Sequence, residues 1–443
     1  MLHYDHPDIR PLLFSGGFGL EKESLRVDEN GLLSQTDHPF PDDEHIVRDF
    51  SENQTEINTS VCHSAQEAIN ELSCHYLRIQ KKLFEMSPRE YLWPFSNPPY
   101  IRSEKDIPVA RFSGDQASKT VYRDYLANRY GRYIMTFSGI HVNFSFDDEL
   151  LKRDYALCEK DLYQDFSDYK NRFYLTLAER AASYGWILTA ATAASPIMDS
   201  SYVEKGILGE DTFFNGMASL RSSEFGYWNF FAPILDYTSI EAYVGSIQRY
   251  VNEGFLASPS ELYYPIRLKS KGVYSMDGLL ENGVSHIELR MFDLNPLIPV
   301  GLDVRDVEFA QYLLIWLIST PHRHLSPSAQ VQAAHNFKIA AHYDLKTVRI
   351  LLQNGDMYGD AYPVADAALA VIATMKDFFR NADSHVQDIL DFQADKFTNP
   401  HNRYAWKVRR LYQDGFVKKG LLLARQRQEE ALNCSAEHAC RSV

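Results

Sequence analysis

Apolar and polar residues follow two different periods along this chain. Between about residues 14 and 60, short runs alternate in polarity every second residue, which is typical of strands with one buried face. From Ala65 to Glu85, apolar residues instead recur every three to four positions, and Ser64 and Glu67 form a capping box before them. This second pattern predicts a helix. Further helices are predicted over residues 118–130, 167–195, 239–254 and 303–319.

The pattern changes after Pro299. Asp303 is the predicted cap of the 303–319 helix, and the remainder to Leu432 is predicted to be mainly helical. Its strongest helical stretches are residues 365–382 and 404–432, the latter interrupted at Gly415 and Gly420. No internal repeat or low-complexity linker divides the chain. We therefore expect one domain over residues 1–443, with a mixed sheet and helix core over 1–300 and a mainly helical section over 301–443.

The run Gly16–Val27 begins with glycines and continues as a strand that carries two acids. Successive strand side chains point to opposite faces, so Glu21 and Glu23 project from the same face about 7 Å apart. Two such carboxylates repel each other and cost desolvation energy unless a cation lies between them. The two interpretations are an exposed acidic strand face and one wall of a cation site.

A second acidic segment, residues 47–59, contains Asp49 and Glu56. These two residues have opposite parity along a strand. A strand that aims both at one site must therefore bend or bulge between them.

Two further predicted strands carry ionisable side chains on a polar face. In residues 138–146, His141 lies on the polar face, where it is either a structural histidine or a ligand. His286, Glu288 and Arg290 share one face of a later strand. A carboxylate beside a guanidinium suits a metal–phosphate pair, in which the acid binds the cation and the arginine binds phosphate oxygens. The alternative is a cross-strand ion pair.

The amino-acid composition limits the kinds of molecule that the chain is expected to bind. The net charge is −14 and no lysine or arginine run occurs, which argues against nucleic-acid binding. The five cysteines are odd in number and form no CxxC. Cys434, His438 and Cys440 near the end form either a terminal metal site or a frayed tail.

The longest apolar run is too short to span a bilayer, and the N-terminus lacks a signal-peptide pattern. We expect no membrane association and a reducing, cytoplasmic setting.

Taken together, the predicted strands supply many carboxylates and at most one imidazole. This set suits Mg²⁺ or Mn²⁺ and suits zinc poorly. Divalent cations beside arginines are what a site needs to hold a polyphosphate and to neutralise a phosphoryl group in transfer. The chain has no P-loop, and the glycines at 16–19 do not precede a helical pattern. A bound nucleotide would therefore be held mainly through metal.

Six segments together resemble a known family. They are GLEKESLRV, DFSENQTEINT, TVYRDYLANRYG, SGIHVNFSF, SLRSSEFGY and HIELRMFDLNP. In this order and spacing they resemble the bacterial glutamate–cysteine ligases, and especially the N-terminal ligase part of the bifunctional glutathione-synthesising enzymes. The resemblance covers about residues 14–320. It implies an α+β fold similar to glutamine synthetase, in which a curved, largely antiparallel sheet forms an open funnel wrapped by helices.

The resemblance also implies roles for particular residues. The positions that match metal ligands are Glu21, Glu23, Asp49, Glu56, His141 and Glu288. Arg290 matches a residue at the transferred phosphate, and with Glu288 and Glu21 it is expected to act in catalysis. The positions that match the substrate pocket are Phe50, Tyr122, Arg123, Arg221, Tyr227 and Tyr263. The family spacing of Asp49 and Glu56 favours a bulge between them over a simple strand.

The implied activity is ATP-dependent ligation of the γ-carboxylate of L-glutamate to the α-amine of L-cysteine through γ-glutamyl phosphate, the first step of glutathione synthesis. Mg²⁺ or Mn²⁺ is the expected cofactor and ATP the co-substrate. The chain carries no ATP-grasp domain, so a separate glutathione synthetase is expected to add glycine. Two alternatives are a ligase of the same fold with a different amine acceptor and a metal-dependent hydrolase.

Overall fold

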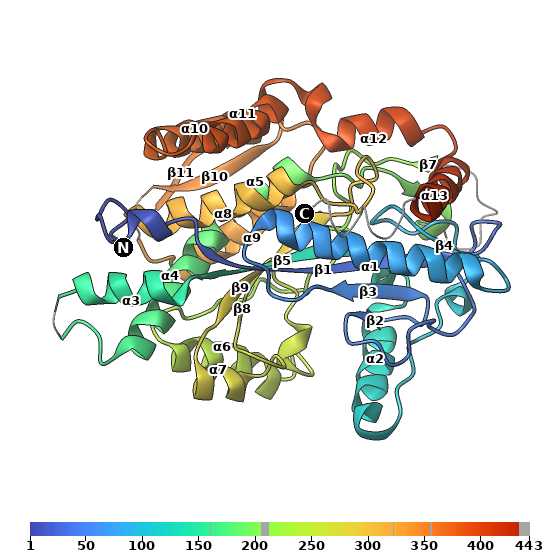
Figure 1. Cartoon of the computed structure of the whole chain (residues 1–443), viewed down its shortest axis with the longest axis horizontal. Coiled ribbons are helices and arrows are strands. Elements are labelled where there is room, and N and C mark those ends of the chain that lie inside the picture. Colours follow the sequence, from blue (N-terminus) through green and yellow to red (C-terminus); the bar gives the residue numbers. More distant parts are fainter. Residues whose placement is uncertain (160, 205–211, 322, 355–356, 434–443) are drawn as a thin grey trace.

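A computed structural model gives the architecture of the chain (Figure 1). It describes residues 1–443 apart from 160, 205–211, 322, 355–356 and 434–443. The cysteine and histidine tail named above lies outside the described residues. None of the described helices has both the length and the apolar character that a bilayer-spanning helix requires.

Among the described residues, seven strands form one open sheet, in which every paired neighbour runs antiparallel. The order is β2-β3-β1-β5-β9-β8, and β4 pairs with the end of β1. The strands are β1 (Gly16–Val27), β2 (Ile46–Arg48), β3 (Gln54–Asn58), β4 (Tyr91–Leu92), β5 (Gly139–Phe146), β8 (Ile266–Lys269) and β9 (His286–Asp293). Two short hairpins lie apart from it, β6 (Met198–Asp199) with β7 (Thr212–Phe213) and β10 (Arg349–Asn354) with β11 (Met357–Pro363).

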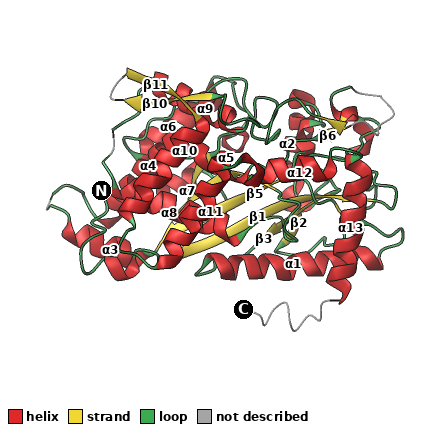
Figure 2. Ribbon diagram, turned by 90° about the horizontal axis from the view of Figure 1, so that it is seen from above, coloured by secondary structure: helices red, strands yellow, loops and turns green. Residues whose placement is uncertain are grey.

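Helices surround the sheet (Figures 1 and 2). Over the first half of the chain they are α1 (Ala65–Glu85), α2 (Ala117–Tyr130), α3 (Asp148–Leu157), α4 (Phe166–Tyr184), α5 (Trp186–Thr192), α6 (Ile240–Asn252) and α7 (Met276–Asn282). The later ones are α8 (Val304–Ser319), α9 (Pro327–Ala340), α10 (Val364–Phe378), α11 (Ser384–Thr398), α12 (Tyr404–Tyr412) and α13 (Phe416–Asn433). The prediction of an open antiparallel sheet wrapped by helices is confirmed.

The strand periodicity decides which side of the sheet is buried against helices. Leu20 on β1, Val142 on β5 and Ile287 on β9 are each at most 1% exposed and belong to one hydrophobic core. Helix α1 packs against β1, β3 and β4, and helices α4 and α5 pack against β9. The polar side chains that alternate with these apolar residues project from the other face of the sheet.

The C-terminal section contains one element that was not predicted and one position at which the prediction is wrong. Residues 349–354 and 357–363 pair as strands β10 and β11 within the mainly helical section, and β10 packs against α9. The Asn354-Gly355 dipeptide is the sequence signal that predicts such a hairpin.

Gly415, with a φ of +89°, separates α12 from α13 as predicted, but Gly420 does not interrupt α13. Gly420 packs against Trp93, and an added Cβ would lie 2.4 Å from the ring. The lack of a side chain at this position therefore allows close packing against Trp93, and the residue does not end the helix.

Candidate functional site

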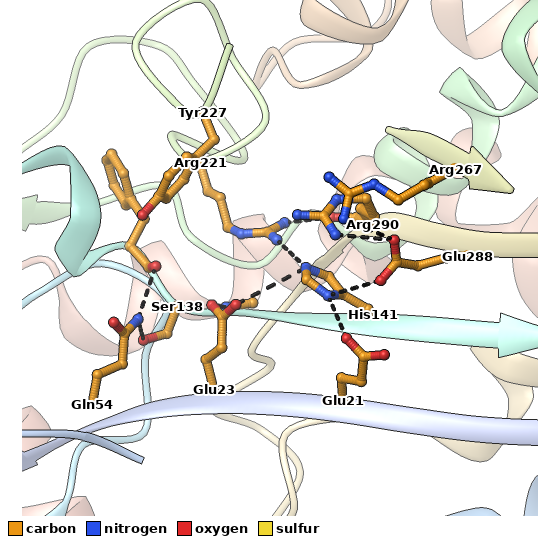
Figure 3. A network of polar contacts seen from close by, with 12 residues as sticks. Glu21, Glu23, Gln54, Ser138, His141, Arg221, Tyr227, Arg267, Glu288 and Arg290 are labelled. Atoms are coloured by element: carbon orange, nitrogen blue, oxygen red, sulfur yellow. Dashed lines mark hydrogen bonds and ion pairs between the residues drawn. The ribbon is translucent and has the colours of Figure 1, made fainter. Parts of the chain in front are cut away.

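One cavity of about 320 Å³ collects the ionisable strand residues. It is bordered by β1, β5, β8 and β9, by the β2–β3 hairpin, by α2 and by the loop over residues 219–229. All of the predicted site residues line it, namely Glu21, Glu23, Asp49, Phe50, Glu56, Tyr122, Arg123, His141, Arg221, Tyr227, Tyr263, Glu288 and Arg290. Figure 3 shows the central part of this network.

Three neighbouring strands bring Glu21, His141 and Glu288 together (Figure 3). The Nδ1 atom of His141 lies 3.1 Å from Oε2 of Glu21 and 3.6 Å from Oε1 of Glu288. One ligand atom from each residue lies within 4.8 Å of the other two. Burial and the charge of Arg290 lower the pKa of His141 to about 4, so its imidazole is neutral at pH 7 and can donate a lone pair.

A β-bulge lies beside this cluster. Ile140 pairs with Phe292 and Val142 pairs with Leu289, so two residues of β9 oppose His141 on β5. Arg290 is one of these two, and its guanidinium is held beside the cluster. A bulge of this kind changes the direction of side chains next to a site.

Glu23, Asp49 and Glu56 form a second acidic group on the same wall. Glu23 on β1 pairs directly with Glu56 on β3. Burial and the charge of Asp49 raise the pKa of Glu23 to about 8, and the same two causes raise the pKa of Glu56. This crowding of acids is the electrostatic condition that a bound cation relieves.

The predicted bulge between Asp49 and Glu56 is wrong. The two residues lie on the two arms of the β2–β3 hairpin, in which Val47 pairs with Glu56. Asp49 follows the end of β2, and its backbone N–H donates to the carbonyl of Gln54 at 3.1 Å. Because a turn separates the two residues, their parity along the sequence does not determine which way they face.

Glu288 is surrounded by cations. It is 1% exposed, and its carboxylate lies 3.0 Å from Nη1 of Arg290, 3.3 Å from Nζ of Lys269 and 3.6 Å from Nη1 of Arg267. These charges outweigh burial and hold the pKa of Glu288 below its usual value. Lys269 also contacts Oε1 of Glu21 at 3.0 Å.

Sequence reasoning assigned no role to Arg267 or Lys269. Both lie on β8, where their equal parity and their pairing with Glu288 and His286 point them to the cavity face. The alternation of apolar and basic residues over 266–269 was the sequence pattern that could have indicated this shared face. Glu288 does form a cross-strand ion pair, with Arg267 of β8 at 3.6 Å, besides its contact with Arg290 of its own strand. The simpler interpretation of that strand therefore holds in the described structure alongside its place in the cavity.

Two arginines are held by backbone carbonyls at the rim of this network. Arg221 donates to the carbonyl of Arg290 at 2.8 Å and crosses β5 at Gly139, where an added Cβ would lie 2.2 Å from its guanidinium carbon. Arg123 on α2 donates to the carbonyl of Asp49 at 2.5 Å. Planar guanidinium groups fixed in this way are suited to bind substrate carboxylates or phosphates.

An aromatic wall completes the cavity. The rings of Tyr227 and Tyr263 meet edge to face with centroids 5.3 Å apart. Phe50 is 3% exposed, and Tyr122 packs beside Tyr125 on α2. This side of the cavity offers a small, mostly apolar surface next to the charged side.

Comparisons with known proteins agree on one family. The glutamate–cysteine ligase family model matches residues 4–254 and 231–340. The glutathione biosynthesis bifunctional protein GshAB of Listeria monocytogenes is 34% identical, over 96% of this chain and 56% of that protein. The protein of the same name from Pasteurella multocida is 30% identical, over 97% of this chain and 55% of that protein. The chain thus spans about half the length of the curated relatives it matches.

Solved structures share the fold. The bifunctional glutathione synthetase from Pasteurella multocida superposes with a TM-score of 0.81 at 27% identity, over 96% of this chain and 54% of that one. The glutamate–cysteine ligase of Francisella tularensis, solved in complex with AMP, superposes with a TM-score of 0.83 at 24% identity. That match covers 96% of this chain and 91% of that one.

Proposed function

The chain belongs to the glutamate–cysteine ligase family, and from this premise we propose that it joins L-glutamate to L-cysteine. In the proposed reaction ATP drives formation of an amide between the γ-carboxylate of glutamate and the α-amine of cysteine. The products are γ-glutamylcysteine, ADP and phosphate. We also propose that the described chain acts as one catalytic unit, because α13 packs against α1 and β4 of the sheet region.

The observation that supports this proposal is that acidic and basic side chains line the same cavity. Six candidate ligands converge on one side, and Arg290, Arg221, Arg267 and Lys269 approach the same space. A polyphosphate needs both cations and positively charged side chains around it. A small-molecule carboxylate needs a fixed arginine, which the cavity also supplies.

The residues present fit divalent cations of the Mg²⁺ type. Oxygen donors dominate the set, and Glu23 and Glu56 have raised pKa values because they are buried among other acids. We assign Glu21, His141 and Glu288 to one cation position and Glu23, Asp49 and Glu56 to another. Mg²⁺ or Mn²⁺ bound there supplies charge neutralisation for the ATP phosphates.

The proposed chemistry has two steps. An oxygen of the glutamate γ-carboxylate attacks the γ-phosphorus of ATP, and ADP leaves with the bond electrons. The amine nitrogen of cysteine then attacks the carbonyl carbon of the acyl phosphate, phosphate leaves, and the amine releases a proton to solvent. The guanidinium of Arg290 stabilises negative charge on the phosphoryl oxygens during transfer. Phosphorylation is needed because oxide is otherwise the leaving group.

We assign the substrate contacts to the arginines and aromatic side chains at the rim of the cavity. We assign Arg123 and Arg221 to the substrate carboxylates, and Phe50, Tyr122, Tyr227 and Tyr263 to the shape of the acceptor pocket. An apolar pocket separates acceptors that differ by one small group by only about 1–3 kcal/mol. A ligase of the same fold with another amine acceptor is therefore the second candidate.

Phosphate release, measured with and without each substrate, tests the proposal. We expect release to require ATP, Mg²⁺, glutamate and an amine, with cysteine preferred over 2-aminobutyrate and both over simple amines. Equal rates with all amines would exclude cysteine as the specific acceptor. Metal-dependent turnover without consumption of nucleotide would favour a hydrolase instead.

Two variants test the assigned cation position directly. Glu21→Gln and Glu288→Gln each keep the side-chain volume but remove a negative charge from the cluster. We expect either substitution to reduce ligation by about 100-fold or more, with circular dichroism unchanged. Near-normal activity in a folded variant would remove that residue from the mechanism.

A further inference from the structure

A second cluster of metal-ligating side chains lies outside the cavity. It joins His45, which directly precedes β2, to Glu71 and His75 on α1. One ligand atom from each residue lies within 4.8 Å of the other two. The two imidazole rings are stacked with centroids 4.8 Å apart, and Nε2 of His75 lies 3.5 Å from Oε1 of Glu71. We propose that His45, Glu71 and His75 form a binding site for a transition-metal dication of the Zn²⁺ class.

The donor set differs from that of the cavity. Two imidazoles and one carboxylate suit Zn²⁺ and related borderline metals, whereas the carboxylate-rich cavity suits Mg²⁺. Glu71 and His75 are four residues apart on a helix, so their side chains lie on one face. His45 reaches this face from the strand side and supplies the third ligand. A solvent molecule would complete a four-coordinate site.

The surrounding contacts hold two of the ligands in place. Nδ1 of His45 donates to the carbonyl of Asn58 at 2.8 Å, which leaves the lone pair of Nε2 for a metal. Glu71 accepts from the backbone N–H of Ser60 at 2.8 Å and from the thiol of Cys62 at 3.2 Å. Metal-binding histidines commonly donate their other ring N–H to a carbonyl in this way, and ligating carboxylates are commonly hydrogen-bonded.

Arg78 is the group that must move. Its Nη1 lies 3.0 Å from Nδ1 of His75, and a guanidinium can only donate, so the hydrogen of this ring is on Nε2 in the metal-free molecule. Metal binding through Nε2 requires that hydrogen to transfer to Nδ1 and Arg78 to leave the ring. The Arg78 side chain is 48% exposed and also pairs with Asp43, so it can leave while keeping that partner.

A metal at this position would join the two elements that it touches. His45 adjoins the β2–β3 hairpin, and Asn58 is the last residue of β3. The same hairpin carries Asp49 and Glu56 into the cavity. Bound Zn²⁺ would therefore hold this hairpin against α1. The inference does not depend on the proposed ligase activity.

Calorimetric titration of the full chain with Zn²⁺ tests the site. The protein is first freed of metal with a chelator and then saturated with Mg²⁺, so that the cavity is filled with its preferred cation. We expect His45, Glu71 and His75 to account for one equivalent of the Zn²⁺ that binds under these conditions. His45→Asn and His75→Gln should each abolish this equivalent. His63→Asn, at an exposed histidine just before α1, is the matched control and should retain it.

Glu288→Gln separates this site from the cavity and should also retain the equivalent. The inference is overturned if the wild-type chain binds no such equivalent, if it persists in either histidine variant, or if Glu288→Gln removes it. His75 is buried, so His75→Gln could prevent folding; in that case His45→Asn, at a partly exposed position, is the variant that tests the site. Zn²⁺ should also raise the melting temperature of the wild-type chain and of His63→Asn, but not that of His45→Asn.

Discussion

The positive charge of Lys269 partly neutralises the carboxylates of Glu21 and Glu288. Its Nζ atom lies 3.0 Å from Glu21 and 3.3 Å from Glu288, and its side chain is 17% exposed. Each contact is worth about 5 kcal/mol of gross Coulomb energy at an effective dielectric constant of about 20. The desolvation of the three groups offsets part of this attraction. Removing one partner of a buried ion pair typically costs about 3–5 kcal/mol in net stability.

Lys269→Met keeps the length of the side chain and removes its charge. For 443 residues the entropy of unfolding is about 0.9 kcal/mol per kelvin. A loss of about 3–5 kcal/mol therefore lowers the melting temperature by about 3–5 °C in the presence of a chelator. Mg²⁺ should reduce this difference, because the cation replaces the lost charge beside Glu21 and Glu288. The variant should also bind Mg²⁺ more tightly than the wild type.

Differential scanning calorimetry with and without Mg²⁺ measures the first effect, and isothermal titration with Mg²⁺ measures the second. Lys271→Met, at an exposed lysine two residues later, is the matched control and should change neither quantity. An equal loss of stability with and without Mg²⁺ would refute the reasoning, since it would show that Lys269 and the cation do not serve the same acids. An unchanged melting temperature in chelator would refute it as well.

Three further predictions concern stability. Gly420→Ala should destabilise the chain by about 1–3 kcal/mol, because its Cβ would lie 2.4 Å from the Trp93 ring. Gly245→Ala, at an exposed helical glycine with nothing within 4 Å, should instead stabilise it by about 0.5–1 kcal/mol. Burial lowers the pKa of His38 from 6.5 to about 4, so the unfolded chain binds this proton more strongly than the folded one. The contribution of His38 to stability should therefore fall by about 2 kcal/mol between pH 7 and pH 5, and His38→Asn should remove that part of the dependence, whereas the exposed His63→Asn should not.

Chemical denaturation at several pH values measures all of these changes. Equal effects of the two glycine substitutions would contradict the packing argument, since both remove the same backbone freedom in a helix. A pH dependence that survives unchanged in the His38 variant would show that other groups account for it.

The periodicity of the chain was sufficient to predict much of the fold. The α1 stripe is buried as predicted, and the side chain of Ser64 caps α1 by accepting from the backbone N–H of Glu67. The polar and apolar faces of β5 and β9 also match their period of two. These features depend on residues close in sequence, so a local pattern specifies them.

The errors at the Asp49–Glu56 segment and at Gly420 share a physical cause. The β2–β3 hairpin and the uninterrupted helix at Gly420 depend on partners far along the chain, namely β1 for the hairpin and Trp93 for the glycine. A local pattern shows that Asp49 and Glu56 are acids in an extended region, but not that a turn separates them. Long-range contacts therefore override the local expectation at these points.

The sequence by itself determined which side chains share a strand face, because the two-residue repeat of a strand is a property of the backbone. It thereby determined that Glu21 and Glu23 lie together, as do Glu288 and Arg290. Only the tertiary structure decided that β1, β5 and β9 are neighbours, in a register that brings His141 between Glu21 and Glu288. It also placed Lys269 among these acids. Strand order and register arise from competition among all pairings in the sheet, so no single segment specifies them.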